Sequence, residues 1–348
     1  MQTYGRELLR HLAPMIDVPV TARVQADAAD ELPDGFDASA APVSGGVRRL
    51  ASSLRPLAAQ EREAIGVGGV VHSLDIDLPI AAGLPTITTV HDLSVFDVPW
   101  AHSSVRARGE QLVVAHAIRS ADAVIAVSGF TAETVATRFG RSATVTSLAP
   151  SPDMTPPSDQ RVADVVARHR LPDRFVLHVG TIEPRKDVPR LARACARLEV
   201  PLVLAGAGSA DDDLPGDVRR LGYVERDDLP ALYAAASVVA YPSVYEGFGL
   251  PPIEAMACGA TVVASAVGAL PELADRARAG EDRVELCPPR DTEALTAMLR
   301  AALDDHDFVR RQREASARLV ATLSWETTAA TTLEVYRAAA ALHTEDAA

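Results

Sequence analysis

Short runs of almost entirely apolar residues recur along the chain, and each is followed by a glycine or polar turn and then by helical spacing of the apolar positions. Short apolar strands that alternate with helices indicate parallel sheets covered by helices on both faces. The pattern therefore predicts an α/β protein. The runs cover residues 69–73, 86–91, 123–128, 175–180, 202–206, 238–242 and 261–265.

A proline-rich polar stretch interrupts this alternation near the middle of the chain. Residues 149–160 read APSPDMTPPSDQ, a composition typical of a linker between domains. A length of 348 residues suits two doubly wound domains of ordinary size. We predict an N-terminal domain over residues 1–155 and a C-terminal domain over residues 165–324.

The chain opens with a helical pattern over residues 4–12. A doubly wound domain normally begins with a strand and a glycine-rich turn instead. The sequence therefore predicts an N-terminal domain that lacks its first strand, either because the start lies upstream of Met1 or because the strand is missing.

Composition narrows the classes of function. A formal net charge of −13 argues against nucleic-acid binding, which usually needs a basic field. No apolar run approaches the ~20 residues of a membrane span, and the N-terminus lacks a secretory signal, so we expect a cytoplasmic protein. The spacing of Cys195, Cys258 and Cys287 suits neither disulfides nor zinc and favours buried thiols.

The only lysine of the chain, Lys186, follows Arg185 directly after an apolar run and a glycine-containing turn. Adjacent cations at the end of a strand suit a diphosphate, because arginine binds it through two hydrogen bonds and lysine adds a compact charge. A solvated basic turn is the alternative.

Two glutamates, Glu246 and Glu254, flank the segment GFGLPPI. Proline suits the first turn of a helix, so we expect a helix that starts near Pro251, with Glu254 inside it and Glu246 on the preceding loop. Gly247 and Gly249 let the backbone approach a ligand, and a helix N-terminus offers free N–H groups. The pattern suits a phosphorylated sugar, and a capped helix with two solvated glutamates explains it equally well.

One histidine is a further candidate, because His91 ends the apolar run 86–91 and precedes Asp92. Ligands of doubly wound domains bind at the carboxyl ends of the strands, although a lone histidine is more often structural. Asp75 and Asp77 have the spacing of a metal-binding DxD motif, and we interpret them as part of a loop.

Together these motifs resemble glycosyltransferase family 4, the retaining transferases of the GT-B architecture, in which two Rossmann-like domains face each other across a cleft. The resemblance extends over nearly the whole chain. Its blocks are TTVHDLSVF at 88–96, ADAVIAVSGFT at 121–131, HVGTIEPRKD at 178–187, LGYVERDDLPALY at 221–233, YPSVYEGFGLPPIEAMACGATVVAS at 241–265 and SWETTAATTLEVY at 324–336.

The resemblance implies a role for each candidate. Glu254 binds the ribose hydroxyls of the donor, and Glu246 faces the transferred sugar. Arg185 and Lys186 stabilise the diphosphate leaving group, and His91 contacts the donor sugar. The implied catalytic set is therefore His91, Arg185, Lys186 and Glu246, and further donor contacts are implied for Gly180, Thr181, Tyr223, Val224, Gly247, Phe248, Gly249 and Leu250.

The resemblance also implies the reaction, which is retaining transfer of a hexose from a nucleotide sugar to a glycan, lipid-linked or small-molecule acceptor in polysaccharide biosynthesis. Mannose from GDP-mannose is the first choice, followed by UDP-glucose and UDP-N-acetylglucosamine. We expect no cofactor and no metal, because two fixed cations can replace it. The helix over residues 325–342 is implied to cross back onto the N-terminal domain.

A catalytically inactive GT-B module that binds a nucleotide sugar or a partner protein is the alternative function. A pyridoxal-phosphate phosphorylase is disfavoured by the short chain. Six arginines of the N-terminal domain are candidates for a basic face that meets a polyprenyl phosphate or the inner face of a membrane, and a solvated face is the commoner explanation. They are Arg48, Arg49, Arg55, Arg62, Arg106 and Arg108.

Overall fold

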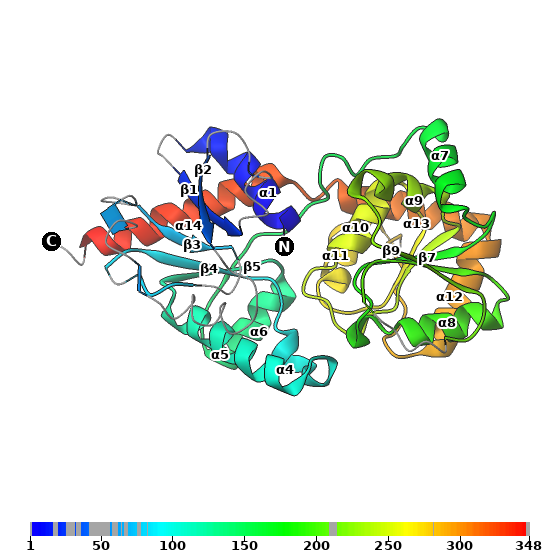
Figure 1. The fold of residues 1–348 in the computed structure, drawn as a ribbon, viewed down its shortest axis with the longest axis horizontal. Coiled ribbons are helices and arrows are strands. Elements are labelled where there is room, and N and C mark those ends of the chain that lie inside the picture. Colours follow the sequence, from blue (N-terminus) through cyan, green and yellow to red (C-terminus); the bar gives the residue numbers. More distant parts are fainter. Residues whose placement is uncertain are drawn as a thin grey trace. The chain divides into compact units, whose positions relative to one another are not determined.

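The computed structural model divides into two compact units, Met1–Leu148 with Ser324–Ala348, and Ala149–Leu323. Both are built from parallel strands and helices (Figure 1), which confirms the α/β class. Residues 149–155, grouped with the N-terminal domain in the sequence analysis, pack with the second unit. The structure describes residues 2–16, 20–25, 32, 36–41, 56–57, 62–63, 65, 69–74, 78–81, 83–208, 214–280 and 282–345.

The main sheet of the first unit has four parallel strands in the order β3-β4-β5-β6. All five residues of β4 are buried, including Thr86, Thr88 and Thr89, as a strand with helices on both faces requires. One face packs against α5 and α6, and the other packs against α14. The strands are β3 (Val71–Ser73), β4 (Thr86–Val90), β5 (Ala123–Ala126) and β6 (Thr144–Val145), and the helices are α4 (Ser94–Asp97), α5 (Ser104–Ser120), α6 (Gly129–Phe139) and α14 (Trp325–Glu345).

The first helix, α1 (Gln2–Leu12), packs against α14. The ring of Tyr4 lies 6.1 Å from that of Trp325, and its hydroxyl is 3.1 Å from the hydroxyl of Thr89 in the main sheet. The strands β1 (Val20–Gln25) and β2 (Phe36–Ala41) form a separate parallel pair, which the apolar runs did not predict because neither segment is continuously apolar.

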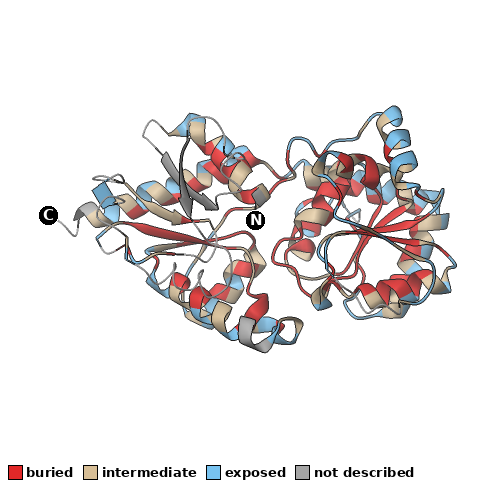
Figure 2. Ribbon diagram, viewed as in Figure 1, coloured by how far each residue is buried: buried red, intermediate tan, exposed pale blue. Residues whose placement is uncertain are grey.

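The second unit has a five-stranded parallel sheet in the order β11-β10-β7-β8-β9. The side chains of β8, β10 and β11 are buried throughout (Figure 2), whereas the edge strand β9 is only half-buried. Two arginines interrupt the apolar pattern of β9, so the pattern of apolar runs did not predict this strand. The strands are β7 (Val176–Val179), β8 (Leu202–Ala205), β9 (Val218–Gly222), β10 (Val238–Tyr241) and β11 (Val262–Ala264).

Helices cover both faces of this sheet (Figure 1). Leucines of α8 and α12 form one core cluster with the strands, and α9, α10 and α13 lie on the opposite face. Within the described part of the chain, no helix is long and apolar enough to cross a membrane. The helices are α7 (Asp159–His169), α8 (Val188–Arg197), α9 (Leu229–Ala235), α10 (Leu250–Ala257), α11 (Leu270–Arg276), α12 (Thr292–Asp304) and α13 (His306–Val320).

Candidate functional site

The strand order of the second unit places two loops side by side. The chain leaves β7 toward β8 on one side, whereas β10, the strand on the other side of β7, belongs to a later part of the chain. Such a switch point, at the carboxyl ends of the strands, is where open α/β sheets bind ligands. The loop after β7 contains Arg185 and Lys186, and the loop after β10 contains Glu246.

The loop after β7 turns sharply at Gly180, whose φ of 139° suits glycine. A side chain on Gly206, at the end of the neighbouring β8, would place its Cβ 2.0 Å from the carbonyl oxygen of Gly180, so these two turns pack backbone to backbone. The chain then forms the 3₁₀ turn η4 (Pro184–Lys186), which presents both cations.

Lys186 and Glu246 form a buried ion pair between the two loops. The lysine Nζ lies 2.6 Å from Oε1 of Glu246, and only 8% of Lys186 and 5% of Glu246 are exposed. The hydroxyl of Ser243 donates a second hydrogen bond to the same oxygen, at 2.6 Å. Burial raises the pKa of Glu246, but the charges of Lys186 and Arg185 outweigh it, so that the pKa lies below its usual range.

Arg185 contacts the same glutamate and is slightly more exposed than Lys186. Its Nη1 lies 3.4 Å from Oε2 of Glu246 and 3.3 Å from the carbonyl oxygen of Tyr245, and its Nη2 lies 2.7 Å from Glu183. The backbone N–H of Val244 donates to the carbonyl oxygen of Arg185. The two loops are thus tied together by main-chain and side-chain contacts.

A buried arginine, Arg190, contacts both the loop after β7 and the loop after β10. Arg190 donates from Nη2 to the carbonyl oxygen of Pro242 at 2.5 Å and from Nε to Asp187 at 2.7 Å. Asp187 has a left-handed backbone with a φ of 50° and separates η4 from α8. The position of the cations therefore depends on a buried polar contact as well as on the turn.

The helix α10 starts at Leu250, one residue before the predicted start, and contains Glu254, which confirms that part of the prediction. Gly249 precedes it with a φ of 89°. Glu254 is 6% exposed and Phe248 is 4% exposed. The alternative of two solvated glutamates is therefore wrong for this fold, and so is the solvated turn for Lys186.

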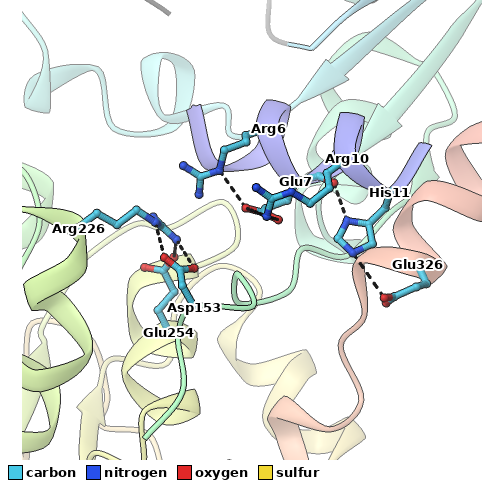
Figure 3. Close-up of polar contacts among 8 residues, drawn as sticks. All are labelled: Arg6, Glu7, Arg10, His11, Asp153, Arg226, Glu254 and Glu326. Carbon is cyan, nitrogen blue, oxygen red and sulfur yellow. Dashed lines mark hydrogen bonds and ion pairs between the residues drawn. The ribbon is translucent and has the colours of Figure 1, made fainter. Parts of the chain in front are cut away.

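Glu254 faces an arginine from another loop (Figure 3). Nη2 of Arg226 lies 3.8 Å from Oε1 of Glu254. The same guanidinium group makes two hydrogen bonds with Asp153, at 2.8 and 3.1 Å. The sequence pattern points to neither Arg226 nor Asp153, because a cation 73 residues from its partner leaves no local pattern.

The remaining predicted donor contacts differ in exposure. Tyr223 is 74% exposed and Val224 is 7% exposed, on the loop that follows β9. Gly247 is buried, Leu250 is half-buried, and Thr181 is exposed beside Gly180. Their assignment to the donor stays a prediction.

The sequence pattern assigned no role to His178, which lies within an apolar run in β7. Its side chain is fully buried, and Nδ1 donates to the carbonyl oxygen of Ala240 at 2.9 Å. Burial lowers the pKa of His178 to about 4, so the ring is neutral at pH 7. A histidine within an otherwise apolar run is the signal that could have identified it.

His91 lies in the first unit, directly after β4. Its Nε2 donates to the carbonyl oxygen of Leu74 at 2.8 Å, and its ring contacts Tyr4 edge-on at 4.7 Å. These contacts hold the ring in place, and a contact with the donor sugar stays a prediction.

Several candidates fall outside the described residues, namely Asp75 and Asp77 of the DxD-like loop and the arginines Arg48, Arg49 and Arg55. Among the described residues, no group of three or more His, Cys, Asp or Glu side chains is placed to hold a metal. The metal-free reaction and the basic face both stay predictions.

Comparisons with known proteins identify the family of the chain. Residues 1–152 match the model for Glycosyltransferase Family 4, and residues 173–305 match the model for glycosyl transferases group 1. The chain is 35% identical over 274 residues to O-antigen chain mannosyltransferase B of Escherichia coli, which covers 72% of this chain and 70% of the relative.

Two further similarities are more distant. The serotype-specific mannosyltransferase WbdA of Escherichia coli is 31% identical over 200 residues, which are 51% of this chain and 23% of that longer protein. The structure of Anabaena HepE in complex with UDP and glucose superposes with a TM-score of 0.70 at 19% identity, covers 95% of each chain and shares the GT-B fold. The chain belongs to glycosyltransferase family 4 and is a glycosyltransferase, an enzyme that transfers a sugar.

Proposed function

We propose that this enzyme transfers mannose from GDP-mannose, with retention of configuration at the anomeric carbon, to a glycan or lipid-linked acceptor. The observation that supports a nucleotide-sugar donor best is the buried cluster of Arg185, Lys186 and Glu246 at the switch point of the second sheet. The similarity to mannosyltransferases supports mannose. UDP-glucose, which is bound in another structure of Anabaena HepE, is the alternative, and UDP-N-acetylglucosamine is a third.

The cluster suits departure of a nucleoside diphosphate. Glycosyl transfer passes through an oxocarbenium-like state, in which the leaving group gains negative charge and the sugar gains positive charge. In the proposed reaction Arg185 and Lys186 stabilise the diphosphate, and fixed charges in a site with little water do so without reorganisation. We assign Glu246 to the sugar, where its carboxylate accepts hydrogen bonds from hydroxyls and stabilises the positive charge.

Glu246 is poorly suited to act as a nucleophile. Its Oε1 already takes hydrogen bonds from Lys186 and Ser243. We therefore propose that the acceptor attacks from the face that the diphosphate leaves and passes its proton to a leaving phosphate oxygen. Attack on the same face retains the anomeric configuration without a covalent enzyme intermediate.

The other half of the donor fits the start of α10 and the loop after β9. In this proposal Glu254 binds the ribose hydroxyls, and the residues from Gly247 to Leu250 present N–H groups to the sugar and phosphate. Arg185 and Lys186 take the part that a metal ion plays in other transferases, so no metal is needed. We place the enzyme in the cytoplasm, at the inner face of the membrane when the acceptor is lipid-linked.

A thermal-shift screen with GDP-mannose, UDP-glucose, UDP-N-acetylglucosamine, ADP-glucose and TDP-glucose tests the donor. A ligand present at about 100 times its dissociation constant stabilises the folded chain by about 2.7 kcal/mol, and we expect the largest shift from GDP-mannose, with EDTA present. An α-mannoside product, identified by NMR, would support retention. A β-linked product, or no shift with any nucleotide sugar, would contradict the proposal.

A further inference from the structure

Arg226 lies between two carboxylates of the second unit (Figure 3). It makes paired hydrogen bonds with Asp153, from Nε at 2.8 Å and from Nη2 at 3.1 Å. Its nearest approach to Glu254 is 3.8 Å. The Arg226 side chain is 26% exposed, that of Asp153 is 48% exposed and that of Glu254 is 8% exposed.

These distances give the two contacts different roles. The pair with Asp153 has hydrogen-bond geometry and fixes the plane of the guanidinium group. The separation from Glu254 is too long for a hydrogen bond but short enough for charge stabilisation. Arg226 therefore supplies positive charge to Glu254 without occupying an acceptor position of that carboxylate.

A buried carboxylate needs a nearby positive charge to stay ionised and so to accept hydrogen bonds from a ligand. When ionised, it accepts hydrogen bonds at both oxygens, and when protonated it loses acceptor capacity and becomes a donor. Removal of the nearby cation favours the protonated form. Burial and, after it, the negative charge of Glu254 raise the pKa of Tyr233, so the carboxylate acts on its buried neighbours as well as on Arg226.

The backbone on either side of Arg226 is anchored. Arg226 begins the 3₁₀ turn η5 (Arg226–Asp228). The carboxylate of Asp228, at its end, accepts hydrogen bonds from Arg161 and Arg168 of α7 at 2.7 and 2.6 Å. The neighbour of Asp153, Met154, is 2% exposed, so the segment that supplies Asp153 is packed into the same unit. Both partners of the pair are therefore held independently of Glu254.

We propose that Arg226, held in place by Asp153, is a positioning residue that keeps Glu254 ionised and oriented for the ribose hydroxyls of the nucleotide. This inference rests on the proposed binding of the ribose by Glu254. It makes donor affinity depend on the segment at the entry of the second unit, although neither Arg226 nor Asp153 touches the nucleotide. A merely structural pair would hold that segment in place and leave ribose recognition unchanged.

Calorimetric binding of nucleotides to the full chain separates these cases. The probes are GDP and UDP, each compared with its 2′,3′-dideoxy form, which offers no ribose hydroxyl. We expect Arg226→Gln to weaken binding of the preferred ribonucleotide on the order of three- to tenfold, as for groups in contact. We expect no weakening of the dideoxy form, partial recovery in Arg226→Lys and a smaller loss in Asp153→Asn.

The variant Glu254→Gln provides the reference. In Glu254→Gln, the further change Arg226→Gln should have no effect, because the residue through which it acts is gone. Arg310→Gln is the matched control, since Arg310 forms an exposed pair with Asp307 on α13 at 2.7 Å and should leave every affinity unchanged. Melting temperatures of all variants report any loss of folding.

The possible failures are distinguishable. Equal weakening of ribo and dideoxy forms, or a lowered melting temperature with unchanged affinity, would show a direct contact or a structural role and overturn the inference. If Glu254→Gln weakens binding and Arg226→Gln does not, the inference fails while the proposed function stands. If Glu254→Gln has no effect, or if neither ribonucleotide binds to the wild type, the proposed donor site fails and the inference fails with it.

Discussion

Lys186 and Glu246 form a buried ion pair whose energetics can be tested. Each side chain is withdrawn from water, and the contact of 2.6 Å compensates the desolvation of both. Loss of one partner leaves an uncompensated buried charge, which typically costs about 3 to 5 kcal/mol.

Lys186→Ala should therefore lower kcat by at least about tenfold and change KM less, because charge on the diphosphate grows as the glycosidic bond breaks. It should also lower the free energy of unfolding, since Glu246 keeps its burial without its counterion. Steady-state kinetics and chemical denaturation measure the two effects.

Glu246→Gln added to Lys186→Ala separates stability from catalysis. The double variant should regain part of the stability, because no unpaired charge remains, and should stay slow. A Lys186→Ala enzyme with raised KM and unchanged kcat would contradict the leaving-group role.

The loops after β7 and β10 hold the cluster because glycines let backbone segments touch. Gly268, after β11, has a φ of 59°, and a Cβ there would lie 1.8 Å from the carbonyl oxygen of Glu246. Gly206 makes the same kind of approach to Gly180. The carboxyl ends of three strands thus depend on residues without side chains.

Gly268→Ala should displace the loop that contains Glu246 and lower both stability and turnover. Gly280→Ala is the matched control, because Gly280 has a φ of 63° and no atom within 4 Å of an added Cβ. The control should lose only the cost of a left-handed alanine, about 1 kcal/mol. Equal losses of stability in the two variants, with full activity in Gly268→Ala, would argue against the contact.

Among the described residues, one histidine in each unit has a pKa well below its usual range, because its ring is withdrawn from water. His72 in the first unit is hydrogen-bonded to Tyr336 at 2.7 Å and to Thr89 at 2.8 Å, and burial, followed by the nearby His91, lowers its pKa to about 3. Burial lowers the pKa of His178 in the second unit to about 4. Both units must therefore take up protons on unfolding in mild acid.

The sign of the pH dependence follows from these values. Between pH 6.5 and about 4 the unfolded chain binds a proton at His178 that the folded chain does not bind, so stability falls as the pH falls through this window. The shift corresponds to a loss on the order of 3 kcal/mol at its acid end. Chemical denaturation from pH 7 to pH 4.5 measures it.

His178→Gln keeps a donor for Ala240 and removes the titration. The variant should lose less stability between pH 7 and pH 4.5 than the wild type does. The same slope in both proteins would show that His178 is not buried neutral.

The local sequence was sufficient to predict those strands and helix ends that depend on neighbouring residues. Continuous apolar runs mark the strands buried on both faces, such as β8 and β10, because such strands expose no face to water. The prolines after Gly249 mark the start of α10, because the fixed φ of proline suits the first turn of a helix. The edge strand β9 was not predicted, because it is partly exposed to water and its sequence is therefore not continuously apolar.

Tertiary packing settled the composition of the site. β10 pairs with β11, the next strand in sequence, and on its other side with β7. The pairing with β7 brings Glu246 to Lys186 across 60 residues. The same pairing brings Ala240 to His178. The loop after β9 places Arg226 between Asp153 and Glu254. No local pattern encodes such contacts, because the charges that compensate a buried group come from whichever distant segments the packed sheets bring together.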